Sequence, residues 1–104
     1  MAEIELGRGR TTLPAGLQVE DGDQRCVVRL DDVGFHVEAL ESLSMPSWKA
    51  TYAWASIVFL EVEATEAGAA IIIGDETPGK QRVELQGAAP AEIEEALGRY
   101  RSAT

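Results

Sequence analysis

Apolar and polar residues alternate along most of the chain, in short segments that turn residues separate, and this pattern predicts β-strands. The predicted strands are residues 3–6, 17–20, 25–30, 35–40, 48–54, 56–64, 69–74 and 81–86. The intervening sequence GRGRTTLPAG has three glycines and a proline, which predicts a loop over residues 7–16. The sequence DDVG predicts a tight hairpin turn, with Gly34 in a left-handed conformation.

The segment from residue 48 to residue 64 contains the longest apolar run and is too long for one flat strand, so a bend is expected near Ala55 and Ser56. The alternation places Ile57 and Phe59 on the opposite face from the core, and Glu61 in solvent. Glu63 is predicted to share that solvent-facing side. The residues predicted to face the core are the even-numbered ones: Trp48, Ala50, Tyr52, Trp54, Val58, Leu60, Val62 and Ala64.

The last part of the chain, GAAPAEIEEALGRYRSAT, has the period of a helix. Pro90 is suited to the first helical position. Glutamates occupy the first turns and arginines the last, which matches the helix dipole. One apolar stripe is formed by Ile93, Ala96, Leu97 and Tyr100. Gly98 is expected to allow close packing where the helix crosses the sheet.

Together these elements predict a mainly β, α+β fold with a single domain over residues 1–104. Short connections favour antiparallel pairing, because parallel pairs need long crossovers. One helix cannot cover seven flat strands. The sheet is therefore expected to fold over on itself, as a small sandwich or a partly open barrel of about seven strands that the C-terminal helix caps.

The charge of the chain indicates which kinds of partner it can bind, and its cysteine content indicates the cellular compartment. The chain has 9 basic and 18 acidic residues, a net charge of −9, which should repel nucleic acid and anionic membranes and would suit a basic partner. Cys26 is the single cysteine, so an intramolecular disulfide is impossible and a reducing compartment is favoured. The N-terminus lacks the apolar region of a secretory signal, and the run AWASIVFL is too short to span a bilayer. These features predict a cytoplasmic protein.

Three stretches resemble the small bacterial pleckstrin-homology-like (PH-like) domains: RCVVRLDDVGFHVEA, YAWASIVFLEVEA and RVELQGAAPAEIEEALGRY. They correspond to an opening hairpin, a strand in which a Trp precedes regular apolar alternation, and a closing strand that leads into a capping helix. The resemblance covers about residues 24–101, with an N-terminal strand and loop at 1–20 outside it. It implies a non-enzymatic binding scaffold. It does not imply phosphoinositide binding, because Arg25 and Arg29 of the first hairpin are offset by Asp23, Asp31 and Asp32.

Residues capable of chemistry are few. His36 and Glu38 form an H-x-E pair, but two ligands are too few for a stable metal site, and a solvent-facing His36 is expected. Cys26 lies in a strand-like run without an activating group, which predicts a small core residue. The neighbouring carboxylates Asp31–Asp32, Glu61–Glu63 and Asp75–Glu76 are expected on turns and exposed strand faces. The sequence therefore predicts neither an enzyme, nor a cofactor, nor a metal.

The residues favoured for partner binding are Trp48, Tyr52 and Phe59. Three large rings at positions 48, 52 and 54 exceed what a small barrel can bury in one line, and Trp48 follows a predicted loop. Phe59 is predicted to lie on the face opposite the core. The first hypothesis is a non-catalytic interaction module that binds a protein partner or associates with itself. The alternatives are a small β-barrel that holds an apolar small molecule and an acidic inhibitor-type protein that masks a basic site.

Overall fold

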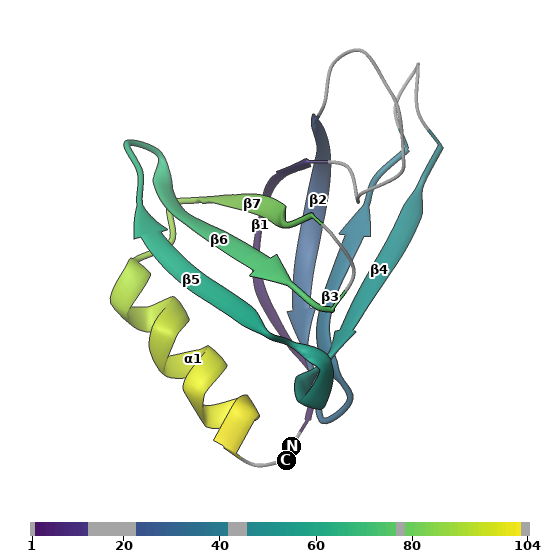
Figure 1. Cartoon of the computed structure of the whole chain (residues 1–104). Coiled ribbons are helices and arrows are strands. Elements are labelled where there is room, and N and C mark those ends of the chain that lie inside the picture. The colour runs from purple at the N-terminus through teal and green to yellow at the C-terminus, as the bar shows by residue number, and fades with distance from the viewer. Residues whose placement is uncertain (1, 13–22, 42–45, 77–78, 103–104) are drawn as a thin grey trace.

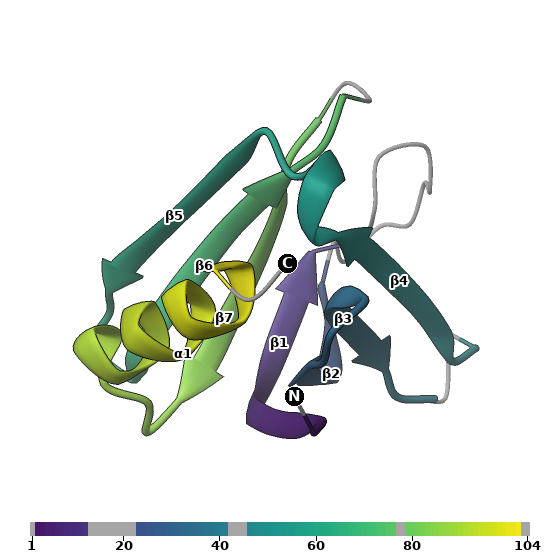
Figure 2. The ribbon, with the colours of Figure 1, turned by 90° about the horizontal axis from the view of Figure 1, so that it is seen from below.

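The structure, a computed structural model, describes residues 2–12, 23–41, 46–76 and 79–102. Seven antiparallel strands form one open sheet in the order β4-β3-β2-β1-β7-β6-β5 (Figure 1). The strands are β1 (Ile4–Thr12), β2 (Asp23–Leu30), β3 (Gly34–Ala39), β4 (Trp48–Ala53), β5 (Phe59–Ala64), β6 (Gly68–Gly74) and β7 (Gln81–Gln86). The sheet is strongly curved, and helix α1 (Pro90–Ser102) packs against β5 and β6. Figure 2 shows the helix beside these strands. The mainly β class with a C-terminal helix is thereby confirmed.

Strand β1 lies at the centre of the sheet and is longer than predicted, since residues 7–12 belong to it rather than to a loop. Gly9, one of the glycines that suggested a loop, allows close strand packing instead. A Cβ on Gly9 would lie 1.6 Å from the carbonyl oxygen of Glu84 in β7, so that only glycine fits there. The strand predicted at residues 17–20 lies outside the described residues.

The predicted bend at residues 55–56 is present, but it separates two strands instead of bending one. A 3-10 turn, η1 (Trp54–Ser56), joins β4 at one edge of the sheet to β5 at the other edge. This turn interrupts the alternation at Ile57 and Val58, and even-numbered residues face the core again at Leu60 and Val62. Ile57, predicted to lie on the face opposite the core, is a buried member of the core cluster, and Val58, predicted to face the core, is 64% exposed.

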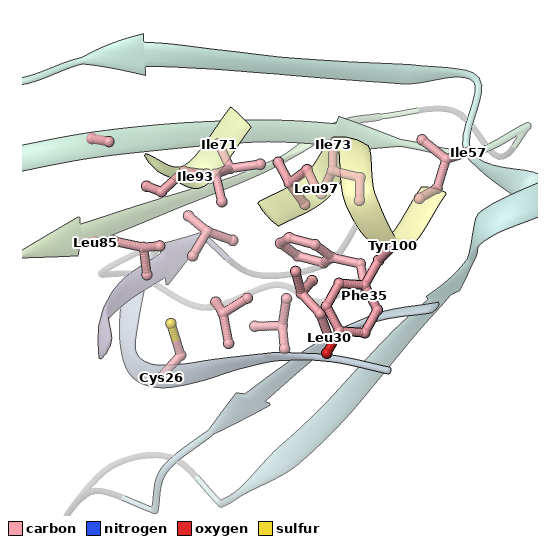
Figure 3. Packing of buried hydrophobic residues seen from close by; sticks show 14 of the residues in the cluster. Cys26, Leu30, Phe35, Ile57, Ile71, Ile73, Leu85, Ile93, Leu97 and Tyr100 are labelled. Atoms are coloured by element: carbon pink, nitrogen blue, oxygen red, sulfur yellow. The ribbon is translucent and has the colours of Figure 1, made fainter. Parts of the chain in front are cut away.

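One cluster of side chains fills the inner face of the curved sheet, as Figure 3 shows for part of it. It combines residues of β2 and β3 with residues of β6, β7 and the helix. Trp48, Tyr52, Leu60 and Val62 pack against its margin, as predicted for even-numbered residues. The buried members are Cys26, Val28, Leu30, Phe35, Val37, Trp54, Ile57, Ala69, Ile71, Ile73, Val83, Leu85, Ile93, Leu97 and Tyr100.

Helix α1 begins at Pro90, as predicted, and its stripe of Ile93, Leu97 and Tyr100 is buried. The ring of Tyr100 stacks on that of Trp54, with ring centroids 6.4 Å apart, and its hydroxyl donates a hydrogen bond to the carbonyl of Ala2. These contacts connect the helix to η1 and to the start of β1.

Two glycines play roles other than those predicted. Gly34 is not in a left-handed conformation, and it is glycine because a Cβ there would lie 2.1 Å from the carbonyl oxygen of Tyr52 in β4. Gly98 faces open space, since a Cβ built on it has no atom within 4 Å. It therefore does not provide a close helix–sheet contact.

Candidate functional site

The most distinctive surface feature is the edge of the sheet at β5, next to helix α1. A groove of about 330 Å³ runs between them. Apolar side chains of both elements form part of its lining, together with two carboxylates and one guanidinium. The residues that line it are Leu60, Glu61, Val62, Glu94, Leu97, Gly98 and Arg101. We refer to these seven residues as the β5–α1 groove.

The backbone of β5 presents unused hydrogen-bonding groups along this groove. Thr65 and Gly68 exchange both backbone hydrogen bonds, at 3.0 and 3.3 Å, at the turn between β5 and β6. In an antiparallel ladder such pairs alternate with non-bonded pairs, so Glu63 and Glu61 bond to β6. The N–H and C=O groups of Leu60 and Val62 therefore point away from β6. No described strand lies on that side of β5.

The two faces of β5 differ in chemistry. The side chains of Leu60 and Val62 are half-buried on the inner face, whereas Glu61 and Glu63 are exposed on the outer face, as predicted. Glu63 pairs with Arg82 of β7 at 3.2 Å. The carboxylate of Glu94 adds negative charge from the helix. The edge thus combines an apolar inner side with an acidic outer side.

Phe59 lies at the start of β5 and is half-buried on its outer face. The ammonium nitrogen of Lys80 lies 3.7 Å from the centroid of its ring, in a cation–π arrangement. Of the three residues predicted to bind a partner, Phe59 is the one on the β5 edge.

Trp48 begins β4 at the opposite edge of the sheet. Its indole nitrogen donates a hydrogen bond to Oε1 of Gln24 at 2.7 Å. The amide nitrogen of Gln24 in turn donates to the carbonyls of Leu40 and Pro46, at 2.7 and 2.9 Å. Trp48 is therefore held in a fixed position by a buried glutamine, with its ring half-exposed.

Tyr52 lies further along β4 and faces the core. Its hydroxyl donates to Oε1 of the buried Gln81 at 2.7 Å, and Gln81 donates to the hydroxyl of Thr11 at 2.7 Å. The ring of Tyr52 contacts the edge of the Phe35 ring. Burial, and secondarily the charge of Asp75, raise the pKa of Tyr52. Tyr52 therefore contributes mainly to the packing and hydrogen bonding of the interior.

The three predicted residues are thus not gathered at one site, because β4 and β5 lie at opposite edges of the sheet. The β5–α1 groove contains none of them. Its helix residues are Glu94, Leu97, Gly98 and Arg101. The sequence pattern predicted for them only roles in helix formation and core packing. The sequence feature that could have indicated the groove is the alternation in β5 of apolar residues at positions 60 and 62 with glutamates at positions 61 and 63.

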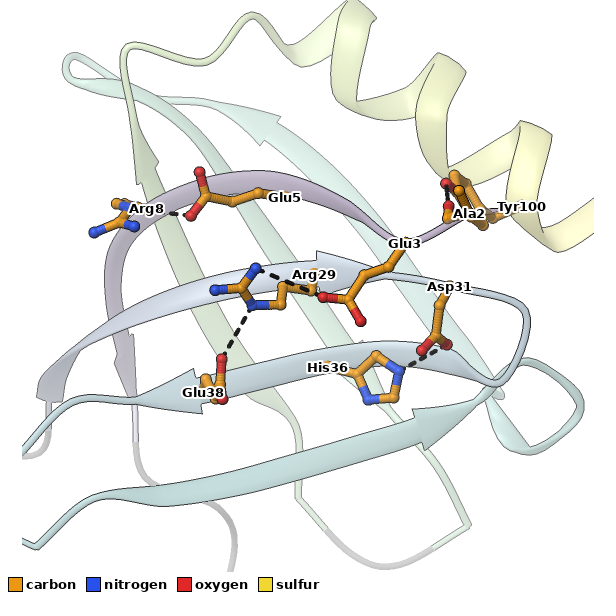
Figure 4. A network of polar contacts seen from close by, with 9 residues as sticks. All are labelled: Ala2, Glu3, Glu5, Arg8, Arg29, Asp31, His36, Glu38 and Tyr100. Atoms are coloured by element: carbon orange, nitrogen blue, oxygen red, sulfur yellow. Dashed lines mark hydrogen bonds and ion pairs between the residues drawn. The ribbon is translucent and has the colours of Figure 1, made fainter.

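His36 is buried, contrary to the prediction, and its carboxylate partner is Asp31 instead of Glu38. Its Nε2 lies 2.8 Å from Oδ1 of Asp31 (Figure 4). Its Nδ1 lies 2.9 Å from the hydroxyl of Thr51. The hydrogen bond from His36 lowers the pKa of Asp31, and the N–H groups of Gly34 and Val33 act in the same direction. These contacts fasten the turn between β2 and β3.

Glu38 pairs with Arg29 at 3.1 Å and does not contact the histidine. Within the described parts of the chain, no group of three or more metal-binding side chains is present. Cys26 is buried in the core, as predicted, and desolvation raises the pKa of its thiol to about 11. At neutral pH the thiol is therefore protonated and a poor nucleophile.

Among residues 2–12, 23–41, 46–76 and 79–102, no helix is long and apolar enough to cross a membrane. Comparisons with protein-family models, with curated proteins and with solved structures find no match to this chain.

Proposed function

We propose that the protein is a non-catalytic interaction module that binds an extended segment of a partner protein as an additional strand at the edge of β5. The observation that carries this proposal is the row of outward-pointing backbone groups at Leu60 and Val62 beside the β5–α1 groove. Edge strands pair readily with extended segments, and main-chain hydrogen bonds supply much of the affinity.

The chemistry of the edge selects the kind of segment. An added strand would have its side chains alternately beside Leu60 and Val62 and beside Glu61 and Glu63. A segment that alternates apolar and basic residues fits both sides. A second β5 does not fit, because antiparallel pairing of β5 with itself places glutamates next to glutamates. The net charge of −9 also favours a basic partner.

The family and location of the protein are part of this proposal. The order of strands followed by a packed C-terminal helix supports a PH-like domain, and such domains commonly serve as binding scaffolds. The single, buried cysteine supports a reducing compartment, and thus the cytoplasm. One continuous cluster of side chains fills the core. This favours the interaction module over the alternative of a barrel that holds an apolar ligand.

The test is a titration of the protein with a fluorescently labelled peptide, RVKVRV, measured by anisotropy. We expect saturable binding, and much weaker binding of the charge-reversed peptide EVEVEV. Glu61→Lys should weaken binding of RVKVRV about tenfold, because it replaces an attraction by a repulsion. The matched control is Glu66→Lys, an exposed charge reversal in the turn after β5, which should change the affinity little.

A backbone variant separates edge pairing from general charge attraction. Ala64 is exposed, and the same alternation directs its N–H away from β6, so Ala64→Pro removes an edge donor without removing a bond to β6. It should weaken peptide binding while the charge is unchanged. Equal binding by the wild-type protein and by Ala64→Pro and Glu61→Lys would rule out the β5 edge as the site.

A further inference from the structure

Strand β4, at the edge of the sheet opposite β5, also has main-chain groups that its own sheet does not use. Next to the end of β4, the N–H of Trp54 donates a hydrogen bond to the carbonyl of Val33 at 3.4 Å. Alternation along the ladder from this pair assigns the even-numbered residues of β4 to bonds with β3. The N–H and C=O groups of Lys49 and Thr51 therefore point away from β3, where no described strand lies.

The unused groups of β4 and β5 match in a parallel pairing. In a parallel pair, the N–H and C=O of one residue bond to the two residues that flank the residue opposite it. With Lys49 opposite Glu61, its main chain would bond to Leu60 and Val62, whose groups also point outward. An antiparallel pairing would use the same groups but would place the side chain of Lys49 on the face of Leu60 and Val62, so the inner face of one sheet would continue as the outer face of the other.

The two strands of one chain cannot form this parallel pair with each other. Strand β4 ends at Ala53 and β5 begins at Phe59, so residues 54–58 form the whole connection. A parallel pair needs a crossover of about a dozen or more residues. A β4 strand that pairs in this way with β5 must therefore belong to a second copy.

The side chains on the outer face are complementary in this register. Lys49 would lie beside Glu61, and Thr51 would lie beside Glu63, so no two like charges meet. Lys49 and Glu61 are both exposed in the single chain. The neighbour of Lys49 on β3 is Glu38, which is paired with an arginine of β2 at 3.1 Å. The outer face thus gains an attraction between the two copies.

The inner faces of the two strands are also complementary. Trp48 would lie beside Leu60, which lines the β5–α1 groove, and Tyr52 would lie beside the small side chain of Ala64. The rings of Trp48 and Tyr52 are half-buried in the single chain, so part of their apolar surface is still accessible to a neighbour. The sequence of β4, WKATYA, therefore has the alternation of apolar and basic or polar residues that the β5 edge favours.

We propose that the β5 edge binds strand β4 of a second copy of this chain, as a parallel strand with Lys49 beside Glu61. This inference rests on the proposed function and names the occupant of that site. Because β4 and β5 are different surfaces, the copies join head to tail and form a ring or an open filament. The net charge of −9 on each copy opposes assembly, so the association should be weaker than the binding of the basic peptide RVKVRV.

The test is sedimentation velocity of the protein over a concentration series up to about 1 mM. We expect the average mass to rise with concentration, and saturating RVKVRV to return it to that of the monomer. Lys49→Glu and Glu61→Lys should each weaken the association about tenfold, because each replaces an attraction between copies by a repulsion. The matched control is Glu66→Lys, which changes the net charge as Glu61→Lys does and should not weaken the association.

An exchange of the two charges identifies the pair. The double variant Lys49→Glu/Glu61→Lys has the net charge of the wild-type protein and again places opposite charges beside each other, so it should associate about as well as the wild type. An equimolar mixture of the two single variants should also associate better than either variant alone. Circular dichroism establishes that each variant is folded.

The failure of this proposal can be told apart from the failure of the proposed function. Lys49→Glu leaves the β5 edge unchanged and should bind RVKVRV as the wild-type protein does. A protein that stays monomeric throughout the series but binds RVKVRV would overturn self-assembly and leave the β5 site in place. Absence of both would remove both. Association that Lys49→Glu does not weaken, or that the double variant does not restore, would also overturn the proposal, because another contact would then join the copies.

Discussion

Strands β4 and β5 follow one another in the chain, yet they form the two opposite edges of the sheet and are stabilised differently. The inner side of β4 carries aromatic rings whose polar ends are fixed by buried glutamines, Trp48 by Gln24 and Tyr52 by Gln81. The inner side of β5 carries Leu60 and Val62, which pack against the core beside helix α1.

This difference leads us to expect different binding behaviour at the two edges. The interior contacts of β4 are satisfied by side-chain hydrogen bonds within the fold. Both edge strands present main-chain groups on their open sides, and those of β5 lie beside a groove that α1 completes. A partner strand at β5 would extend the ladder and also contact the helix. We therefore expect the helix to be required both for folding and for the proposed site.

The largest effect is expected from the helix that supports the β5 side. Leu97 is buried against the core, and Leu97→Asp places an unpaired charge there. We expect a loss of several kcal/mol in the free energy of unfolding, or failure to fold. Chemical denaturation measures this loss. Gly98→Asp adds the same charge at the neighbouring exposed position, and it should leave a folded protein. An unchanged midpoint for Leu97→Asp would show that the helix is not docked.

The next effect tests the interruption of the alternation at Ile57 and Val58, between β4 and β5. Ile57 is 5% exposed and Val58 is 64% exposed. Ile57→Ala should therefore destabilise the protein by about 2–5 kcal/mol, whereas Val58→Ala should stay within about 0.5 kcal/mol. Thermal and denaturant unfolding of the two variants compares them directly. The reverse order would mean that the alternation runs unbroken from β4 into β5.

A smaller effect tests the polar ends of the β4 rings. Tyr52→Phe removes the hydroxyl that donates to the buried Gln81 and should cost about 1–2 kcal/mol at neutral pH. Because the fold raises the pKa of Tyr52, stability is complete below the usual pKa of 10.0 and declines as the pH rises above it. The loss of stability at alkaline pH should therefore be smaller in Tyr52→Phe than in the wild-type protein. The Cys26 thiol, whose pKa is about 11, should cause the rest of this loss in both proteins. An identical decline would exclude a raised pKa at Tyr52.

The smallest effect is a gain. Gly98 lies in the interior of α1, with open space around its Cβ position. Gly98→Ala should raise the free energy of unfolding by about 0.5–1 kcal/mol, because alanine favours the helix more than glycine does. A loss of stability would indicate that Gly98 is needed for close packing after all.

The alternation of apolar and polar residues was sufficient to predict most strands and the core stripe of the helix, because each strand has one buried face. The alternation did not predict the structure correctly at positions where a contact with a distant part of the chain determines the conformation or the burial of a residue. The glycines of β1 resembled a loop, but Gly9 is required by the approach of Glu84 from β7. The burial of His36 depends on Asp31 in the turn and Thr51 on β4, which the sequence does not place beside it.

The candidate sites were harder to predict than the fold. The rings of Trp48 and Tyr52 were correctly identified as inner-face residues, but their binding partners within the fold, Gln24 and Gln81, come from distant strands. The β5–α1 groove requires the edge position of β5 and the docking of α1 together. Neither can be deduced from the period of a single segment.

The most direct test of the β5 edge is amide hydrogen exchange at residues 60–63, measured by NMR with and without the peptide RVKVRV. In the free protein, Glu61 and Glu63 should exchange slowly, because their amides bond to β6, and Leu60 and Val62 should exchange faster. Saturating peptide should slow exchange at Leu60 and Val62 about tenfold or more and leave the alternate residues nearly unchanged. Unaltered exchange at Leu60 and Val62, or new protection at Lys49 and Thr51 of β4 instead, would contradict the proposed site.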